Sequence, residues 1–206
     1  RPPRSTLFPY TTLFRSGTTQ MCIMLAVFMG KVLKKKTAVA GDEVTYSLML
    51  RQMQKAAAIQ HKGIASRHAY SMDGIDYYCG IRDEDIGILR QKYDVIILDI
   101  SFENTFDNTN VTFARMVSRL SACDEKILAG SMLPWKSREC EKKMERIERF
   151  LDIRGLKMVT LAACDKEAVS IIKKHGVEVV LIPFERNPFV ISGENLRSFL
   201  ELLKIT

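Results

Sequence analysis

A carboxylate stands at the end of a short apolar run near the middle of the chain. Residues 95–98 are Val-Ile-Ile-Leu, flanked by polar residues, and Asp99 follows them directly. Such a run is typical of a strand buried on both faces of a parallel sheet. Ligands of open α/β sheets bind beyond the carboxyl ends of the strands. We therefore expect Asp99 to face Mg²⁺, a phosphate-bound water or a phosphoryl group; the alternative is that it only caps the following loop.

Two further segments could join this carboxylate. Gly17, Thr18 and Thr19 open an apolar helix, and the free N–H groups at a helix N-terminus favour phosphate. Asp42 follows a second short strand, residues 37–41. A phosphate cradle, a hydroxyl that can bind Mg²⁺ and a carboxylate behind the metal are the parts of a P-loop nucleotide site. These segments could converge on one edge of a parallel sheet.

The composition bounds the class of protein. A chain of 206 residues with 47% hydrophobic and 27% charged residues fits one globular domain with a full core. No apolar run approaches the roughly 20 residues that span a bilayer. The five cysteines are scattered without a CxxC pair, and the three histidines form no cluster. We expect reduced cysteines, a cytoplasmic location and no zinc site.

The first residues differ in character from the rest. Residues 6–16, Thr-Leu-Phe-Pro-Tyr-Thr-Thr-Leu-Phe-Arg-Ser, read like the translation of a common sequencing-library adapter. We therefore treat residues 1–16 as a non-native segment and expect a single domain over 17–206. Without the three arginines of that segment, the net charge falls from +7 to +4. That is a weak signal for nucleic acid.

Strands and helices alternate strictly after this segment. The alternation predicts a three-layer α/β domain, with a mostly parallel sheet, helices on both faces and right-handed crossovers. The expected strands are 37–41, 75–79, 95–99, 126–130, 156–162 and 177–182. The expected helices are 19–33, 43–58, 83–91, 111–123, 136–151, 166–175 and 194–203, the last with Ser192 as its N-cap. Residues 60–71 and 102–110 are expected to be loops.

The order of these motifs resembles the ParA/MinD class of P-loop ATPases. The resemblance is carried by residues 93–99 (Tyr-Asp-Val-Ile-Ile-Leu-Asp), by residues 74–80 and by the strand-proline sequence 181–184. More narrowly, the chain is similar to uncharacterised ParA-like proteins of Firmicutes with a degenerate Walker A motif. Their Gly-Thr-Thr helix, Lys-Lys-Thr-Ala-Val strand and Ser-x-x-Pro-Trp-Lys turn match residues 17–19, 35–39 and 131–136. The resemblance implies a P-loop NTPase-like fold whose first strand and P-loop start are truncated or replaced here.

The resemblance also implies a site for ATP and Mg²⁺. Its expected members are Gly17 and Thr18 at the phosphates, Thr19 near the metal, Asp99 behind a metal-bound water, Asp42 near the attacking water and Pro183 beside the base. The Walker motif carries a lysine directly after its last glycine, and Thr18 stands there in this chain. Losing a charge-assisted contact of this kind costs several kcal/mol of phosphate stabilisation. ATP hydrolysis is therefore expected to be impaired.

Three functions remain open on the sequence. The first is a nucleotide-responsive switch or adaptor with weak or no ATP hydrolysis, and the second is a non-catalytic interaction module of the same fold. The third is a receiver-like domain that would accept a phosphoryl group on Asp99, with Ser131 as the switch hydroxyl. The chain has about one βα unit too many for a receiver, and Ile182 occupies the position of its lysine.

Partners are indicated only by analogy. ParA/MinD-type proteins commonly form dimers that sandwich nucleotide, so a homodimer is the expectation, and the protein partner is not encoded in any motif. The final helix carries Arg197 and Glu201 and is expected to pack as a terminal helix instead of anchoring to a membrane.

Overall fold

The computed structural model describes residues 6–12, 17–41, 57–58, 68–101, 110–152, 156–161 and 165–205. Nine strands within these ranges form one sheet, in the order β3-β4-β5-β2-β6-β1-β7-β8-β9. All pairs from β5 to β9 are parallel, and the pairs β3–β4 and β4–β5 are antiparallel. The strands are β1 (Thr6–Thr12), β2 (Thr37–Gly41), β3 (Ala57–Ala58), β4 (His68–Met72), β5 (Ile75–Cys79), β6 (Val95–Ser101), β7 (Ile127–Ala129), β8 (Lys157–Thr160) and β9 (Glu178–Leu181). The expected mostly parallel sheet is confirmed.

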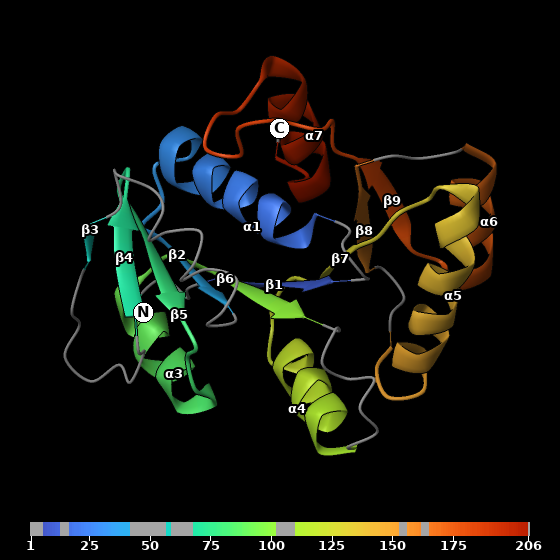
Figure 1. Cartoon of the computed structure of the whole chain (residues 1–206), viewed down its shortest axis with the longest axis horizontal. Helices are drawn as coiled ribbons and strands as arrows, with labels where there is room; N and C mark the ends of the chain where they lie inside the picture. Colours follow the sequence, from blue (N-terminus) through green and yellow to red (C-terminus); the bar gives the residue numbers. More distant parts are fainter. Residues whose placement is uncertain are drawn as a thin grey trace.

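Helices cover both faces of this sheet (Figure 1). They are α1 (Thr18–Val27), its continuation η1 (Phe28–Val32), α3 (Asp83–Lys92), α4 (Asn110–Ser121), α5 (Pro134–Glu148), α6 (Asp165–His175) and α7 (Gly193–Leu203). The helices α1 and α7 lie together on one face, whereas α3 and α4 lie on the other (Figure 1). The expected three-layer α/β architecture is therefore confirmed.

Alternation along the strands creates two hydrophobic cores. In β6, Val95 and Ile97 point into the core shared with α1 and α7, while Ile96 and Leu98 point into the core shared with α3 to α6. Successive side chains of a strand face opposite sides, so a sheet covered on both faces requires a continuous apolar run. This requirement explains the Val-Ile-Ile-Leu sequence before Asp99.

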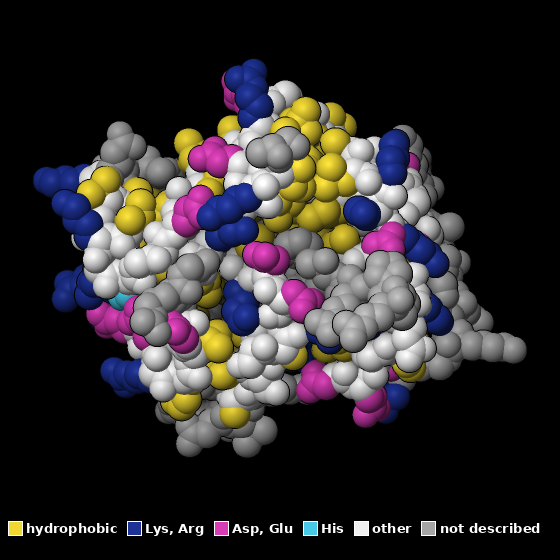
Figure 2. All heavy atoms as spheres, turned by 180° about the vertical axis from the view of Figure 1, so that it is seen from behind, with side chains coloured by type: hydrophobic (Ala, Val, Ile, Leu, Met, Phe, Trp, Pro, Cys, Tyr) yellow, Lys and Arg dark blue, Asp and Glu magenta, His cyan; other side chains and the backbone are white. Residues whose placement is uncertain are grey.

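The helix α1 is buried on nearly every side. All residues from Met21 to Met29 are at most 4% exposed. Phe28 stacks on Phe199 of α7, with ring centroids 5.4 Å apart. The sheet and α7 together enclose α1, as expected for a helix that is apolar all round. Figure 2 shows further hydrophobic side chains gathered at the surface of the layer that α1 and α7 form.

The strand β1 lies where we expected no native structure. Thr6–Thr12 pairs with β6 on one side and β7 on the other, in the middle of the sheet. Ladder hydrogen bonds join backbone groups, so a β-prone stretch of suitable length can occupy this position whatever its origin. Pro9 lies opposite Leu98 and has no N–H to donate, and proline is normally excluded from central strands. The segment is thus part of this fold, while its non-native origin stays a prediction.

Other boundaries differ from the expectation in two places. Residues 57–58 form β3, so the expected helix 43–58 is wrong at its end, and residues 43–56 lie outside the described ranges. Residues 68–71 belong to β4, which pairs antiparallel with β5, so the loop expected over 60–71 is wrong there. An antiparallel edge strand can carry polar residues on its open side, which hides it from a search for apolar runs. The remaining strands and helices lie within a few residues of their expected positions.

Within the described ranges, no helix combines the length and the apolar character that crossing a bilayer requires.

Among the described residues, four cysteines are buried and form no disulfide: Cys22, Cys79, Cys123 and Cys140. The expected core position of the cysteines is confirmed for these four, while their reduced state in the cell stays a prediction.

Candidate functional site

The carboxyl ends of the parallel strands meet the start of α1 at one edge of the sheet. The connection from β1 to β2 runs through α1 and crosses β6 on one face of the sheet. The connection from β6 to β7 runs through α4 and crosses β1 on the opposite face (Figure 1). Adjacent strands whose connections leave in opposite directions create a crevice at their carboxyl ends. The start of α1 and the end of β6 both lie at this point.

A hydrogen bond joins these two elements directly. The hydroxyl of Thr19 donates to the carboxylate of Asp99, with Oγ1 and Oδ2 2.8 Å apart. Asp99 is 9% exposed, so it is largely shielded from bulk solvent. The expected meeting of the helix start and the strand-end carboxylate is therefore present in the structure.

Gly17 fixes the direction of α1. It is the residue before the first helical turn and adopts φ = 77°, a left-handed conformation that favours glycine. A Cβ at this position would lie 2.5 Å from Cδ1 of Leu161, the residue that follows β8. Glycine is thus favoured both by the backbone conformation and by the close approach of Leu161.

The first turn of α1 offers amide groups to an anion. The N–H of Met21 bonds to the carbonyl of Gly17 at 2.9 Å and is the first intrahelical bond. By helix geometry, the N–H groups of Thr18, Thr19 and Gln20 have no acceptor within the helix. They lie at the positive end of the helix dipole, the usual position for a bound phosphate or carboxylate.

The segment after β9 also contacts this turn. The side-chain amide of Gln20 donates to the backbone carbonyl of Glu185. Pro183 lies two residues earlier in the same segment and is half-buried. The segment that contains Pro183 therefore reaches the start of α1, while a role of Pro183 beside a base stays a prediction.

Two expected site residues, Thr18 and Asp42, remain to be placed. Thr18 is 1% exposed, so a short, neutral side chain lies buried in the first turn of α1, and its correspondence to the Walker lysine stays a prediction. Asp42 lies outside the described residues, and its expected role near an attacking water stays a prediction. Sequence reasoning missed Gln20 and Leu161, although the place of Gln20 next to Thr19 in the first turn was a usable signal.

The oxygen donors at this site suit a magnesium ion. Mg²⁺ prefers hard oxygen ligands and is commonly held by one or two protein groups together with substrate phosphates and water. The Thr19 hydroxyl and the Asp99 carboxylate, 2.8 Å apart, provide such groups. Elsewhere in the described part of the chain, no cluster of three or more His, Cys, Asp or Glu side chains could hold a metal.

Comparison with known proteins gives neighbours among solved structures. No protein-family model matches the sequence, and no curated protein matches it. Among solved structures, the MinC:MinD cell division protein complex of Aquifex aeolicus is similar with a TM-score of 0.70 and 12% identity, covering 98% of this chain and 97% of that one.

Two further neighbours have the same architecture. A putative plasmid partition protein of Borrelia burgdorferi B31, bound to AMPPNP, has a TM-score of 0.58 and 13% identity, with 98% of each chain covered. A ParA family ATPase of Chlorobium tepidum has a TM-score of 0.58 and 13% identity, covering 99% of this chain and 94% of that one. At such low identity the likeness concerns the fold alone. The chain has the α/β fold of the ParA/MinD-type P-loop ATPases.

Proposed function

We propose that this protein is a nucleotide-responsive switch or adaptor that binds ATP with Mg²⁺ at the start of α1 and hydrolyses it weakly or not at all. The observation that carries the proposal is the hydrogen bond from Thr19, in the first turn of α1, to Asp99 at the end of β6. This contact places two oxygen groups that can bind a metal next to the backbone amides that can bind phosphate.

Each residue has a distinct role in this proposal. The amides of the first turn of α1 would hold the phosphates, Thr19 would bind Mg²⁺, and Asp99 would orient a water on the metal. A bound Mg²⁺ would neutralise phosphate charge. Pro183 would lie beside the base, because the segment that contains it is hydrogen-bonded to Gln20. Weak hydrolysis follows from Thr18, which brings no positive charge to the phosphates.

A binding experiment with an isosteric variant tests this function. Nucleotide at ten times its dissociation constant stabilises the folded state by about 1.4 kcal/mol. For a chain of this length, that raises the melting temperature by roughly 3–5 °C. We expect this shift for the wild-type protein with ATP and Mg²⁺, and we expect Asp99→Asn to abolish it. Asparagine can still accept the bond from Thr19, so the variant removes the charge while keeping the contact.

Asp124→Asn provides a matched control, because Asp124 is exposed in the turn before β7. It should retain the full shift. A wild-type protein that shows no shift at millimolar ATP would contradict the proposal and favour the non-catalytic interaction module.

The interaction module is the second candidate, and a specific observation favours it. The side chain of Leu161 lies close to Gly17 and so fills space beside the start of α1, where the phosphates are proposed to bind. The receiver-like reading has no such support. Receivers have the five-stranded order 2-1-3-4-5, and the nine-stranded sheet described here differs from it.

The proposed partner and location follow the same analogy. One of the neighbours is a complex of MinD with MinC, which shows that this fold can present a surface to a protein partner. We propose a homodimer formed at the carboxyl edge and a cytoplasmic location. Size-exclusion chromatography with light scattering, with and without ATP and Mg²⁺, tests the homodimer.

A further inference from the structure

The candidate site has an unbalanced charge. A polyphosphate ligand would bring more negative charge to the start of α1 than one Mg²⁺ neutralises, and Asp99 already contributes a carboxylate there. Thr18 contributes none of the positive charge that a lysine would supply at its position. The helix dipole offsets only part of this, being equivalent to about half a unit charge. A protein that binds phosphate here needs a cation from another segment.

Few cations lie on the segments at this edge. Within the described ranges, Arg82 follows β5, Lys136 opens α5, Lys166 opens α6 and Arg186 follows β9. Arg82 is already paired with Glu84, at 2.8 Å between Nη1 and Oε1. Lys136 and Lys166 lie in the first turns of α5 and α6, which follow β7 and β8. Arg186 differs from the others because the residue before it is bonded to the first turn of α1.

The surroundings of Arg186 hold its backbone in place. Upstream, the N–H of Ile182 bonds to the carbonyl of Thr160 at 2.9 Å, which continues the ladder of β9. Downstream, the N–H of Val190 bonds to the carbonyl of Asn187 at 3.1 Å, and Ser192 caps α7. Between these points, Gln20 holds the carbonyl of Glu185. The segment is thus anchored on both sides of Arg186.

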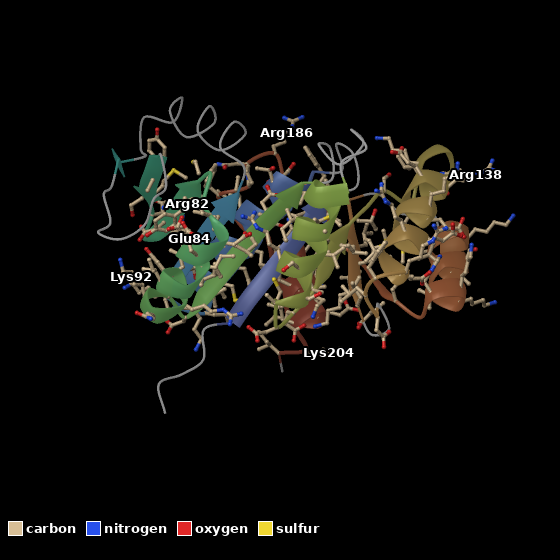
Figure 3. The ribbon with its side chains drawn as sticks, turned by 90° about the horizontal axis from the view of Figure 1, so that it is seen from below. Arg82, Glu84, Lys92, Arg138, Arg186 and Lys204 are labelled. Atoms are coloured by element: carbon tan, nitrogen blue, oxygen red, sulfur yellow. The ribbon has the colours of Figure 1, made fainter. Side chains whose placement is uncertain are left out.

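The side chain of Arg186 is free to bind a ligand. It is exposed and has no ion pair with any side chain in the described ranges. Figure 3 shows Arg186 at one edge of the molecule and Lys204, which follows α7, at the opposite edge. Arg186 therefore lies at the edge where β9 ends and α7 begins. A guanidinium group can bind phosphate oxygens in a bidentate manner.

We propose that Arg186 is a phosphate-binding residue that replaces the missing Walker lysine, and that Gln20 positions it through the carbonyl of Glu185. This inference rests on the proposed nucleotide function and adds to it the source of the positive charge. Thr19 and Gln20, consecutive in the first turn, then have complementary tasks. Thr19 contacts the carboxylate of Asp99, and Gln20 holds the segment that carries Arg186.

Calorimetric titration of the full-length chain tests the proposal, with two probes: ATP and inorganic tripolyphosphate, each with Mg²⁺. Arg186→Gln should lower the affinity for both probes about 10-fold or more, because it removes a charge-assisted hydrogen bond to phosphate. Arg186→Lys should recover part of the affinity, since it restores the charge without the bidentate geometry. Arg197→Gln, an exposed arginine on α7, is the matched control and should bind like the wild type.

A double-mutant cycle tests the role of Gln20. Gln20→Ala alone should lower the affinity for both probes, as Arg186→Gln does. When Arg186 is already replaced, Gln20→Ala should cause little further loss of affinity. Equal binding by the wild type and Arg186→Gln would overturn the role of the arginine. Fully additive losses would overturn the positioning role of Gln20. If the wild type binds neither probe, the nucleotide function itself fails, and that result is distinct from both others.

Discussion

Replacing Gly17 by alanine should destabilise the protein, because this residue sets the start of α1. Gly17 has φ = 77°, and the added Cβ would lie 2.5 Å from Cδ1 of Leu161. A non-glycine residue in the left-handed region costs about 1–2 kcal/mol. The overlap with Leu161 adds about 1 kcal/mol, since a leucine side chain can shift but loses packing when it does. We expect Gly17→Ala to lower the free energy of unfolding by roughly 2–3 kcal/mol.

The two contributions can be separated by a second substitution. In a Leu161→Ala background the overlap disappears and only the backbone strain remains. Gly17→Ala should then cost about 1 kcal/mol less than it does in the wild type. Urea denaturation followed by circular dichroism measures all four free energies of the cycle.

A glycine in a different environment provides the control. Gly87 lies inside α3, and a Cβ there would meet no atom within 4 Å. Gly87→Ala should stabilise the protein by about 0.5–1 kcal/mol, because alanine favours the helix. A neutral or stabilising effect of Gly17→Ala would refute the reasoning, since α1 would then not begin at a left-handed residue packed against Leu161.

Two further predictions concern the interior. Phe199→Ala should lower the free energy of unfolding by about 3–5 kcal/mol, because Phe199 is fully buried and stacks on Phe28. As a control, Phe150→Ala at an exposed position should change the free energy of unfolding by about 0.5 kcal/mol or less. Equal effects in urea denaturation would contradict the packing of α7 on α1. Burial raises the pKa of the Cys123 thiol to about 12, so at pH 8 only about one molecule in 10,000 carries the thiolate there. Iodoacetamide should therefore leave Cys123 unmodified in the native protein and alkylate it in urea, as mass spectrometry of its peptide can show; rapid native alkylation would contradict its burial.

The sequence predicts the site because it depends on local patterns. The apolar run before Asp99 is typical of a strand with both faces covered, and the longer apolar sequence after Gly17 is typical of a buried helix; both lie in the two cores of the structure. Parallel strands place their carboxyl ends at one edge. Once both elements are assigned, the meeting of Thr19 and Asp99 follows from topology.

The contacts that sequence reasoning missed depend on the tertiary fold. Gln20 binds a backbone carbonyl 165 residues away, and a backbone acceptor leaves no side-chain signal in the sequence. Leu161 reaches Gly17 only because β8 ends beside the start of α1. The strand β4 escaped notice because an antiparallel edge strand can carry polar residues such as His68 and Ser71.

The most direct test of the proposed site is a titration of the ¹⁵N-labelled protein with ATP and Mg²⁺, followed by amide chemical shifts. We expect the largest changes at Thr18, Thr19 and Gln20, whose N–H groups have no acceptor within α1, and at Asp99. Unchanged amides at the start of α1, or changes confined to another part of the sheet, would contradict a nucleotide site at this position.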